Sequence, residues 1–268
     1  MSELLEILNI KDFTKENIKY LLSENNLEKR KIIAEFSSEI RVNVQKDFHH
    51  SEKLIEISNY CNADCTFCQS RNDNTKINRF RLNREEIIEE AVSLYKSGCE
   101  SILIHSGYDD FYNTDRIAYI IYSIKKKVNI KITMSLGLRE LSEYKVWKIA
   151  GADSYFLNFV TQSDEMYHKT NSWDTFENRI NHIAELKRLG YNVGSGSIIG
   201  LPNQTLDDLA KDILSSKNLD VDYINFCRYS TIRTKHNDLS SEEFIKRGLE
   251  VAQIIIPELT VGINNLLN

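Results

Sequence analysis

Three of the five cysteines in this 268-residue chain lie close together in a pattern that suits metal chemistry. Cys61, Cys65 and Cys68 directly follow the alternating apolar run Leu54–Ser58, with the spacing C-x3-C-x2-C. Structural zinc sites usually pair two C-x2-C knuckles, or one knuckle with two histidines. A cubane 4Fe–4S cluster normally takes four thiolates. A single group of three thiolates therefore predicts an iron–sulfur cluster with one iron open to an outside ligand.

Three other side chains decide whether that open position is closed by the protein. Cys99 precedes the expected strand Ser101–His105, about 17–20 Å from its other end, so we expect Cys99 to be a buried thiol rather than a ligand. Cys227 ends a later strand and is either a core thiol or a substrate-side residue. His105 is a second substrate-side candidate, and as a fourth ligand it would give a Cys3His zinc site instead of a cluster.

Short β-rich runs alternate with longer helical patterns along the chain. The expected strands are Leu54–Ser58, Ser101–His105, Ile130–Ser135, Ser154–Asn158, Asn192–Ile198, Tyr223–Cys227 and Leu259–Ile263. Such alternation predicts repeated βαβ units and a parallel sheet, which right-handed crossovers close toward a barrel. A doubly wound open sheet is the competing fold, but no GxGxxG loop follows the first strand.

The expected fold is an α/β parallel barrel of the TIM type that is incomplete, with about six βα units plus a seventh strand. Residues 1–50 are expected to form an N-terminal helical extension of two helices, at 14–23 and 27–44. Residues 51–268 are expected to form the partial barrel, in a single domain overall. Chemistry in such barrels collects at the carboxyl ends of the strands, where the three cysteines lie.

Composition limits the classes of partner. The formal net charge is −5, from 34 basic and 39 acidic residues, so no global basic field attracts nucleic acid or an acidic membrane. No apolar run approaches the ~20 residues of a bilayer span, and the acidic, amphipathic N-terminus is not a secretory signal. Five cysteines in such a chain favour reduced thiols. We expect a soluble, cytoplasmic protein with neither nucleic-acid nor membrane partners.

The cysteine spacing, with Phe67 just before the last cysteine, resembles the signature of the radical S-adenosylmethionine (SAM) superfamily. The chain is most similar to the group of FeFe-hydrogenase maturase, biotin synthase and methylornithine synthase, through EISNYCNADCTFCQSRNDNTKINRFRLNREEI and DTFENRINHIAELKRLGYNVGSGSIIGLPNQTLDDL. The resemblance implies a 4Fe–4S cluster whose open iron binds the amino and carboxylate groups of SAM. It also implies reductive cleavage of SAM to methionine and a 5′-deoxyadenosyl radical, which takes hydrogen from a substrate.

The resemblance assigns cofactor contacts to several positions. Phe67 would lie against the adenine. The backbone of Ser106, Gly107 and Tyr108 would bind the methionyl ammonium, and glycine suits a turn that the cofactor approaches closely. Ser135, at a strand end, would lie beside the methionyl group.

Four later residues complete the implied cofactor site. Arg179 would pair with the cofactor carboxylate, since a guanidinium offers two parallel donors; the alternative is a solvated helix arginine. Asn158 would lie beside the cofactor. Ile199 and Leu201 would contact the adenine, a role that any apolar strand residue could mimic.

The sequence departs from the family at one important position. Val160 stands where these relatives place a carboxylate toward the ribose hydroxyls, and Asn158 or Thr161 would have to substitute. Arg71 and Arg79, with Arg81, form a small basic group that either is a solvated face or steers an anionic substrate. Substrate identity therefore does not follow from the resemblance.

The sequence favours a radical SAM enzyme that acts on a small amino-acid-derived or sulfur-containing molecule. It would take electrons from a donor of the reduced flavodoxin or ferredoxin type, and the open side of the barrel leaves room for a partner chain. Val160, together with a chain that stops after a seventh strand, motivates an alternative: a catalytically altered cluster carrier or partner subunit. A zinc-stabilised barrel is the third interpretation.

Overall fold

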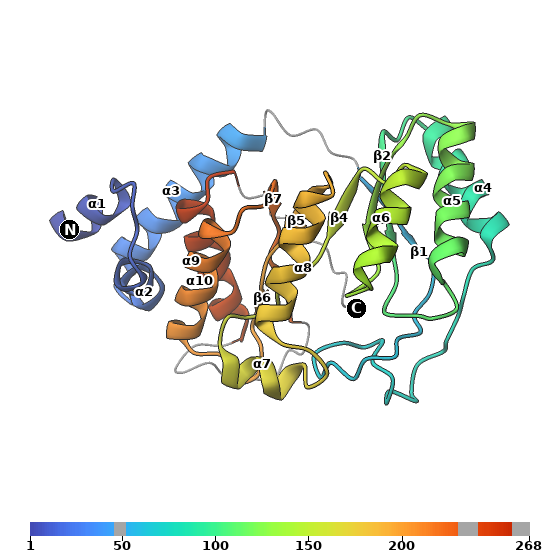
Figure 1. Cartoon of the computed structure of the whole chain (residues 1–268). Coiled ribbons are helices and arrows are strands. Elements are labelled where there is room, and N and C mark those ends of the chain that lie inside the picture. The colour runs from blue at the N-terminus through green and yellow to red at the C-terminus, as the bar shows by residue number, and fades with distance from the viewer. Residues whose placement is uncertain (46–51, 230–240, 259–268) are drawn as a thin grey trace. The chain divides into compact units, whose positions relative to one another are not determined.

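The computed structural model describes residues 1–45, 52–229 and 241–258, and its helices and strands alternate along the chain (Figure 1). The chain divides into two compact units, which are described separately. We call His50–Leu157 with His168–Gly194 the cysteine unit, because it holds Cys61, Cys65 and Cys68. We call Met1–His49 with Asn158–Tyr167 and Ser195–Asn268 the helical unit.

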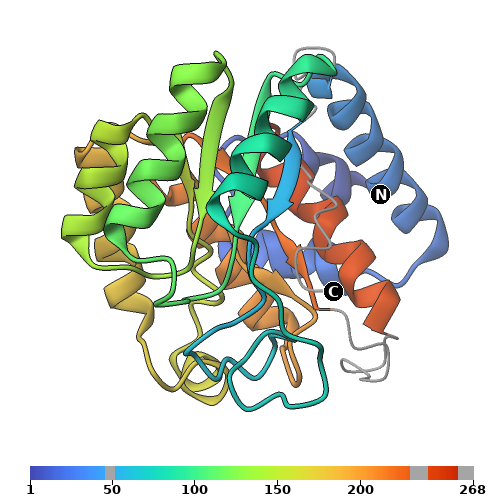
Figure 2. The same cartoon turned by 90° about the vertical axis from the view of Figure 1, so that its right-hand side faces the viewer.

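The cysteine unit is built on a parallel sheet whose strands pair in the order β1-β2-β3-β4-β5. Helices α4, α5 and α6 lie along one face of these strands, and α6 also packs against α8 (Figure 2). The elements are β1 Lys53–Glu56, α4 Arg84–Lys96, β2 Ser101–His105, α5 Thr114–Lys127, β3 Lys131–Ser135, α6 Leu141–Ala150, β4 Ser154–Phe156, α8 Phe176–Arg188 and β5 Asn192–Ser195, the last residue of which belongs to the helical unit.

Local sequence signals explain where these elements begin and end. The strand β2 reads SILIH and is buried along almost its whole length, as in a parallel sheet covered on both faces. Asn83 caps α4 in a capping box with Glu86. Gly151 ends α6 with a φ of 115°, a conformation that favours glycine. The expected α/β class with a parallel sheet is confirmed.

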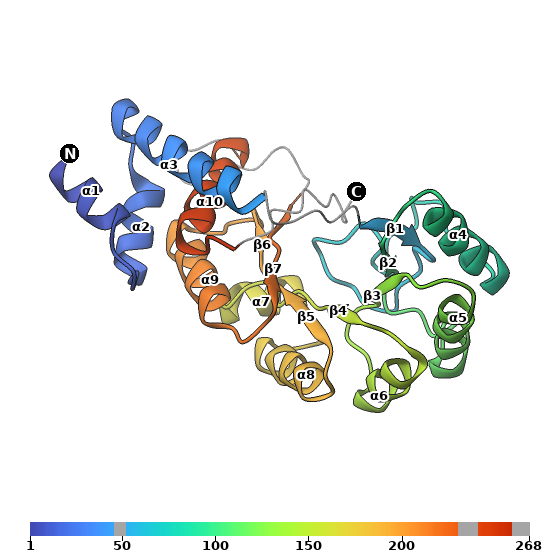
Figure 3. The same ribbon diagram turned by 90° about the horizontal axis from the view of Figure 1, so that it is seen from above.

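The helical unit packs its helices around one apolar core. Leu21 of α2, Leu209 of α9 and Phe244 of α10 are fully buried in this core. Figure 3 shows α2, α3, α9 and α10 grouped together. The elements are α1 Ser2–Leu8, α2 Lys15–Ser23, α3 Leu27–Gln45, β6 Ile198–Ile199, α9 Leu206–Asn218, β7 Tyr223–Ile224, β8 Cys227–Arg228 and α10 Ser241–Ile255, and α7 Asp164–Thr170 begins in this unit. Within the described residues, no helix has the length and apolarity that crossing a bilayer requires.

The structure differs from the sequence-based expectation in four elements. The expected strand Tyr223–Cys227 is divided into β7 and β8, so Cys227 begins β8 and does not end a strand. The expected strand Asn192–Ile198 is interrupted around Gly196, where a Cβ atom would lie 2.0 Å from the Asn225 carbonyl oxygen. The backbones approach too closely there for a regular ladder, so the strand divides into β5 and β6. The N-terminal segment has a third helix, α1, and α7 was not expected. The expected strand Leu259–Ile263 lies outside the described residues.

Asp212 of α9 is a buried carboxylate that connects two loops of the helical unit. Its Oδ1 accepts hydrogen bonds from Thr161 Oγ1 (3.1 Å) and from the Gln162 backbone N–H (2.7 Å). Its Oδ2 accepts one from Gln204 Nε2 (3.1 Å), and Gln204 Oε1 accepts the Gly200 N–H (2.8 Å). Burial raises the pKa of Asp212 to about 8, against the effect of these hydrogen bonds.

This raised pKa makes stability depend on pH. Between the unfolded pKa of 3.8 and the folded value of about 8, the folded chain holds a proton that the unfolded chain releases. Stability from this group is therefore present at low pH and is lost as pH rises toward 8. We expect Asp212→Asn, which cannot ionise, to lose less stability between pH 6 and pH 8 than the wild type in urea unfolding. Glu39→Gln, at an exposed position, is the control. Equal pH dependence in Asp212→Asn and wild type would contradict the assignment.

Candidate functional site

The three cysteines lie in one long connection between β1 and α4, which we call the cluster loop (residues 57–83). Figure 2 shows this loop, drawn in blue-green, gathered beyond one end of the strands. Because the loop follows β1, it leaves from the carboxyl end of the sheet, where parallel βα folds place their chemistry. Cys65 is buried, and Cys61 and Cys68 are half-buried.

A single guanidinium organises the backbone of this loop. Arg79 donates hydrogen bonds to the carbonyl oxygens of Asn59, of Ser70 (2.9 Å), of Arg71 (2.7 Å) and of Asn74 (3.1 Å). The planar fork of donors suits such convergent acceptors, whereas a lysine offers a point charge. Arg79 thus replaces the hydrogen bonds that a helix or strand would have supplied.

A second arginine fastens both ends of the cluster loop to the turn after β2. Arg81 donates to both carboxylate oxygens of the buried Asp109, at 2.8 and 2.9 Å, and Ser58 Oγ donates to the same carboxylate at 2.6 Å. The Arg81 guanidinium also lies over the ring of Tyr60, at 3.8 Å. Burial alone would raise the pKa of Asp109, but these hydrogen bonds hold it below its ordinary value. Arg79 and Arg81 are therefore structural parts of the loop and not the free basic group that the sequence suggested.

The turn after β2 lies directly against the first cysteine. The Tyr108 backbone N–H donates to Cys61 Sγ (3.3 Å), and the Tyr108 carbonyl accepts the Asn62 N–H (2.8 Å). A Cβ atom on Gly107 would lie 2.6 Å from Cys61 Cβ and 2.8 Å from Cys61 Sγ. Only glycine fits at this contact, which explains its place in the sequence.

The second cysteine is held by a segment that is distant in the sequence. Trp173 Nε1 donates to Cys65 Sγ (3.1 Å), and Cys65 Sγ donates to Asn171 Oδ1 (3.1 Å). The backbone N–H of Thr66 donates to the carbonyl of Thr170 (2.9 Å). Nothing in the pattern of the sequence indicated these contacts, because they join residues more than 100 positions apart.

The chemistry of these thiols fits a bound iron cluster. Burial raises the pKa of Cys61 and of Cys68, and raises that of Cys65 to about 11, although Trp173 and the charge of Arg179 act in the opposite direction. Such thiols become thiolates when a metal supplies positive charge. As the side chains stand, no group of three His, Cys, Asp or Glu among the described residues is in metal-ligand geometry. The fit rests on the cysteine spacing, on the amide donors and on the space left by Gly107.

Several predicted cofactor residues lie next to one another in the cysteine unit. The Ser106 N–H donates to the Ser135 carbonyl (3.1 Å), and Ser106 Oγ donates to the Gly107 carbonyl (2.7 Å). Ser135 Oγ lies 3.4 Å from His105 Nδ1, and burial lowers the pKa of His105 to about 4. Phe67 is half-buried in the cluster loop. The structure thus places Gly107 and Tyr108 against Cys61 and joins Ser106 to Ser135, while the contacts of these residues with SAM stay predictions.

Arg179 is not a solvated helix arginine. It lies in the first turn of α8, is 7% exposed, and its Nε donates to Asp174 Oδ2 (2.8 Å). Asp174 is itself 7% exposed and also accepts from Asn178 Nδ2 (2.7 Å). A buried guanidinium must be paired, and Asp174 provides that pairing. The predicted contact of Arg179 with the SAM carboxylate remains a prediction.

The remaining predicted residues belong to the helical unit. Asn158 Nδ2 donates to Cys227 Sγ (3.3 Å), and Asn158 Oδ1 accepts the Val160 N–H (2.7 Å). Val160 is 1% exposed with a φ of 74°, an uncommon conformation for a β-branched residue. Burial raises the pKa of Cys227 to about 11. The side chain of Ile199 packs in the core of the unit.

Leu201 is also fully buried. The contacts of Leu201 and Ile199 with adenine stay predictions. Cys99 is 5% exposed and its Sγ donates to the Ser101 carbonyl (3.0 Å), as expected for a buried thiol.

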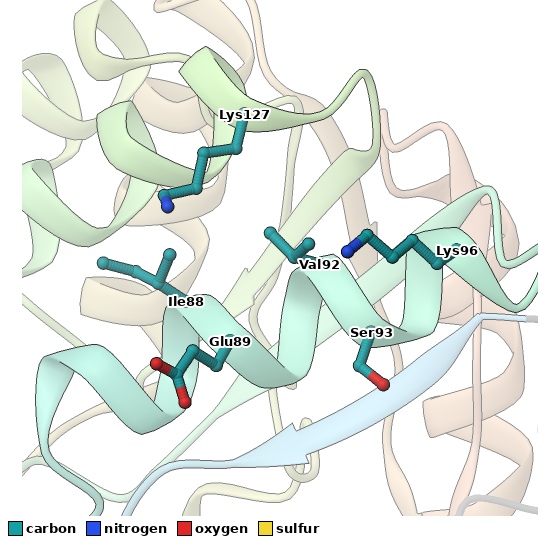
Figure 4. A pocket seen from close by; sticks show the side chains of 6 residues that line it. All are labelled: Ile88, Glu89, Val92, Ser93, Lys96 and Lys127. Carbon is teal, nitrogen blue, oxygen red and sulfur yellow. The ribbon is translucent and has the colours of Figure 1, made fainter.

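A surface pocket lies away from these residues, on the outer helices of the cysteine unit. It is lined by side chains of α4 and by Lys127 at the end of α5 (Figure 4). Helices of βα units run antiparallel to the strands, so the carboxyl-terminal half of α4 lies toward the end of the sheet opposite the cluster loop. The labelled residues are Ile88, Glu89, Val92, Ser93, Lys96 and Lys127. These residue types do not match a known catalytic or metal-binding arrangement.

Comparisons with known proteins agree with this geometry. The profile of the Radical SAM superfamily matches residues 55–214 of the chain. The FeFe-hydrogenase maturase subunit HydE of Thermotoga maritima is 39% identical over 222 residues, 83% of this chain and 64% of that protein. The 3-methylornithine synthase of Methanosarcina acetivorans is 29% identical over 64% of this chain and 49% of its own length. The biotin synthase of Methanococcus aeolicus is 29% identical over 76% of this chain and 66% of its own length. The chain thus spans about half to two thirds of these curated relatives.

Solved structures show the same fold. The crystal structure of methylornithine synthase (PylB) superposes with a TM-score of 0.83 at 22% identity, covering 96% of this chain and 77% of that chain. The FeFe-hydrogenase maturase HydG superposes with a TM-score of 0.79 at 19% identity, covering 97% of this chain and 62% of that chain. At these identities the likeness concerns the fold, and it agrees with an incomplete parallel barrel.

The two kinds of cysteine give a direct test of the site. We expect Cys65→Ala to abolish iron retention after anaerobic reconstitution, because two thiolates cannot hold the cluster. We expect Cys99→Ala to leave the iron content unchanged, because Cys99 hydrogen-bonds within its own strand segment. Iron and sulfide are measured per chain. Loss of iron in Cys99→Ala alone would contradict the assignment of the site to the cluster loop.

The contact at Gly107 gives a second test. The methyl group of Gly107→Ala would overlap Cys61, and overpacking of this kind costs about 1–3 kcal/mol. We expect the variant to bind iron about tenfold more weakly, which corresponds to about 1.4 kcal/mol, in a competition with a chelator. Gly98→Ala is the control. It strains the backbone, because Gly98 has a positive φ, but the added methyl has nothing within 4 Å. Equal iron affinity in Gly107→Ala and wild type would show that Cys61 moves freely.

Proposed function

This chain belongs to the Radical SAM superfamily, and from that premise we propose that it is an enzyme that cleaves SAM reductively and uses the resulting radical on a small molecule. Members of the superfamily use a 4Fe–4S cluster together with SAM. The observation that carries the proposal is the contact of Cys61 with the turn Ser106–Tyr108, at which Gly107 leaves room for nothing larger than hydrogen. This contact joins the predicted cluster ligands to the predicted SAM-binding backbone.

The bound cluster would supply one electron to SAM, which breaks its C–S bond and yields methionine and a 5′-deoxyadenosyl radical. Cys61, Cys65 and Cys68 would hold three of the irons. The chain's own contribution is to bind and orient. The backbone carbonyl groups of Ser106–Tyr108 would accept hydrogen bonds from the methionyl ammonium. Arg179, which pairs with Asp174, would bind the carboxylate.

We propose a substrate that is amino-acid-derived or contains sulfur. Two relatives are named for making such compounds, 3-methylornithine and biotin. In the helical unit, Asn158 Nδ2 donates to Cys227 Sγ, and we propose that Cys227 has a substrate-side role. Superfamily members take electrons from a reductant, and we propose a reduced flavodoxin or ferredoxin for this chain in the cytoplasm. We further propose that residues 51–268 act as one domain with residues 1–50 as its extension, and that a partner chain covers the open barrel side.

One observation favours a second candidate. Val160 is buried, strained and apolar at the position where the resemblance implies that relatives place a ribose-binding carboxylate. A protein without that acceptor would bind SAM more weakly, which suits a cluster carrier or a partner subunit without turnover. The same experiment separates the two candidates.

The test is anaerobic reconstitution followed by addition of dithionite and SAM. We expect about four irons per chain and release of 5′-deoxyadenosine, detected by mass spectrometry. Cys65→Ala is the negative control, and a biotin synthase treated in the same way is the positive control. Four irons without 5′-deoxyadenosine, under conditions that activate the control, would support the carrier. If the chain binds zinc and no iron, the result would support the third interpretation, a zinc-stabilised barrel.

A further inference from the structure

Trp173 lies between α7 and α8, outside both the cluster loop and the predicted SAM contacts. Its indole Nε1 donates a hydrogen bond to Cys65 Sγ at 3.1 Å. The ring is 38% exposed, while Cys65 is 8% exposed. The indole N–H of Trp173 therefore points toward the sulfur of Cys65, which has little contact with water.

The sulfurs of Cys61 and Cys65 differ in the kind of N–H group that donates to them. Cys61 Sγ accepts from backbone N–H groups, those of Ala63 (3.4 Å) and Tyr108 (3.3 Å). Those donors are part of the main chain, so among substitutions only proline, which also fixes φ, removes them. Cys65 Sγ receives its N–H from a side chain, and a single substitution can remove that donor without changing a ligand.

The position of Trp173 is fixed by its neighbours. The adjoining Asp174 is buried and pairs with Arg179 (2.8 Å), and the Arg179 guanidinium lies 5.6 Å from the Trp173 ring centroid. The carbonyl of Thr170 accepts the Thr66 N–H (2.9 Å), which ties the same segment to the residue after Cys65. The indole donor is thus held in place from both sides.

An N–H donor at an iron-bound thiolate stabilises the more negative, reduced state of a cluster. Reduction adds one electron and breaks no bond, so its charge spreads over the irons and sulfurs, including the ligand thiolates. Hydrogen bonds to these sulfurs are among the factors that set the reduction potentials of iron–sulfur clusters. The effect is largest where water is excluded, as it is at Cys65.

We propose that Trp173 raises the reduction potential of the cluster held by Cys61, Cys65 and Cys68, through its indole N–H bond to the Cys65 sulfur. Trp173 is a tuning residue and not a ligand. This inference rests on the cluster of the proposed function, and it adds a determinant of how readily that cluster accepts an electron.

The experiment is a redox titration with dithionite as the electron source, followed by the EPR signal of the reduced cluster. We expect Trp173→Phe to take up as much iron as the wild type and to be about tenfold harder to reduce, a shift of about 59 mV downward for one electron. Trp173→His retains an N–H donor and should recover at least half of that shift. Tyr122→Phe, at an exposed position on α5, is the control and should not change the potential.

A second measurement can be decided on the wild type alone, with Trp173→Phe as a comparison. The chain has two tryptophans, and Trp147 donates its N–H to the Thr114 carbonyl (3.1 Å). After labelling of the indole nitrogens with ¹⁵N, the reduced wild type should show a ¹⁵N hyperfine coupling that Trp173→Phe lacks. Absence of that coupling in the wild type would overturn the proposal, even if Trp173→Phe fails to assemble.

The outcomes separate this inference from the proposed function. If the wild type binds no iron, the proposed function fails and the tuning role fails with it. If Trp173→Phe holds four irons at an unchanged potential, or if the His and Phe variants are shifted equally, only the tuning role is overturned.

Discussion

The convergence of backbone carbonyls on Arg79 is the interaction on which the site depends. The cluster loop spans residues 57–83 without a helix or a regular strand, so some of its backbone carbonyls need partners outside the main chain. Arg79, which itself belongs to the loop, donates hydrogen bonds to these carbonyls. The bidentate pair of Arg81 with Asp109 attaches the loop to the turn after β2. The bonds of Arg79 hold the backbone on both sides of the three cysteines, at Asn59 and at Ser70.

The same constraint explains why the turn after β2 carries a glycine. Once the loop is attached through Asp109, Cys61 lies against residues 106–108, and any side chain at Gly107 would displace it. The thiol and the neighbouring amide groups therefore share one small space. This arrangement links the fold to the proposed chemistry, since a ligand that reaches an iron beside Cys61 also meets the backbone of that turn.

Local signals in the sequence predicted most of the elements, and the cysteine site stays a prediction, whereas long-range contacts could not be predicted. The strand β2 was expected from its apolar residue types and is confirmed, and the caps at Asn83 and Gly151 follow equally local rules. The contact of Trp173 with Cys65 joins positions 108 residues apart, so no local pattern could predict it. The break at Gly196 likewise depends on the approach of Asn225, which lies between β7 and β8.

The central claim is that three thiolates hold a four-iron cluster and leave one iron open to SAM. Mössbauer spectra of the ⁵⁷Fe-reconstituted chain, recorded before and after addition of SAM, test it most directly. The account predicts that one iron in four changes its isomer shift toward a higher coordination number when SAM is added, while the other three are unchanged. Four irons that are equivalent before addition and unaffected after it would contradict the account.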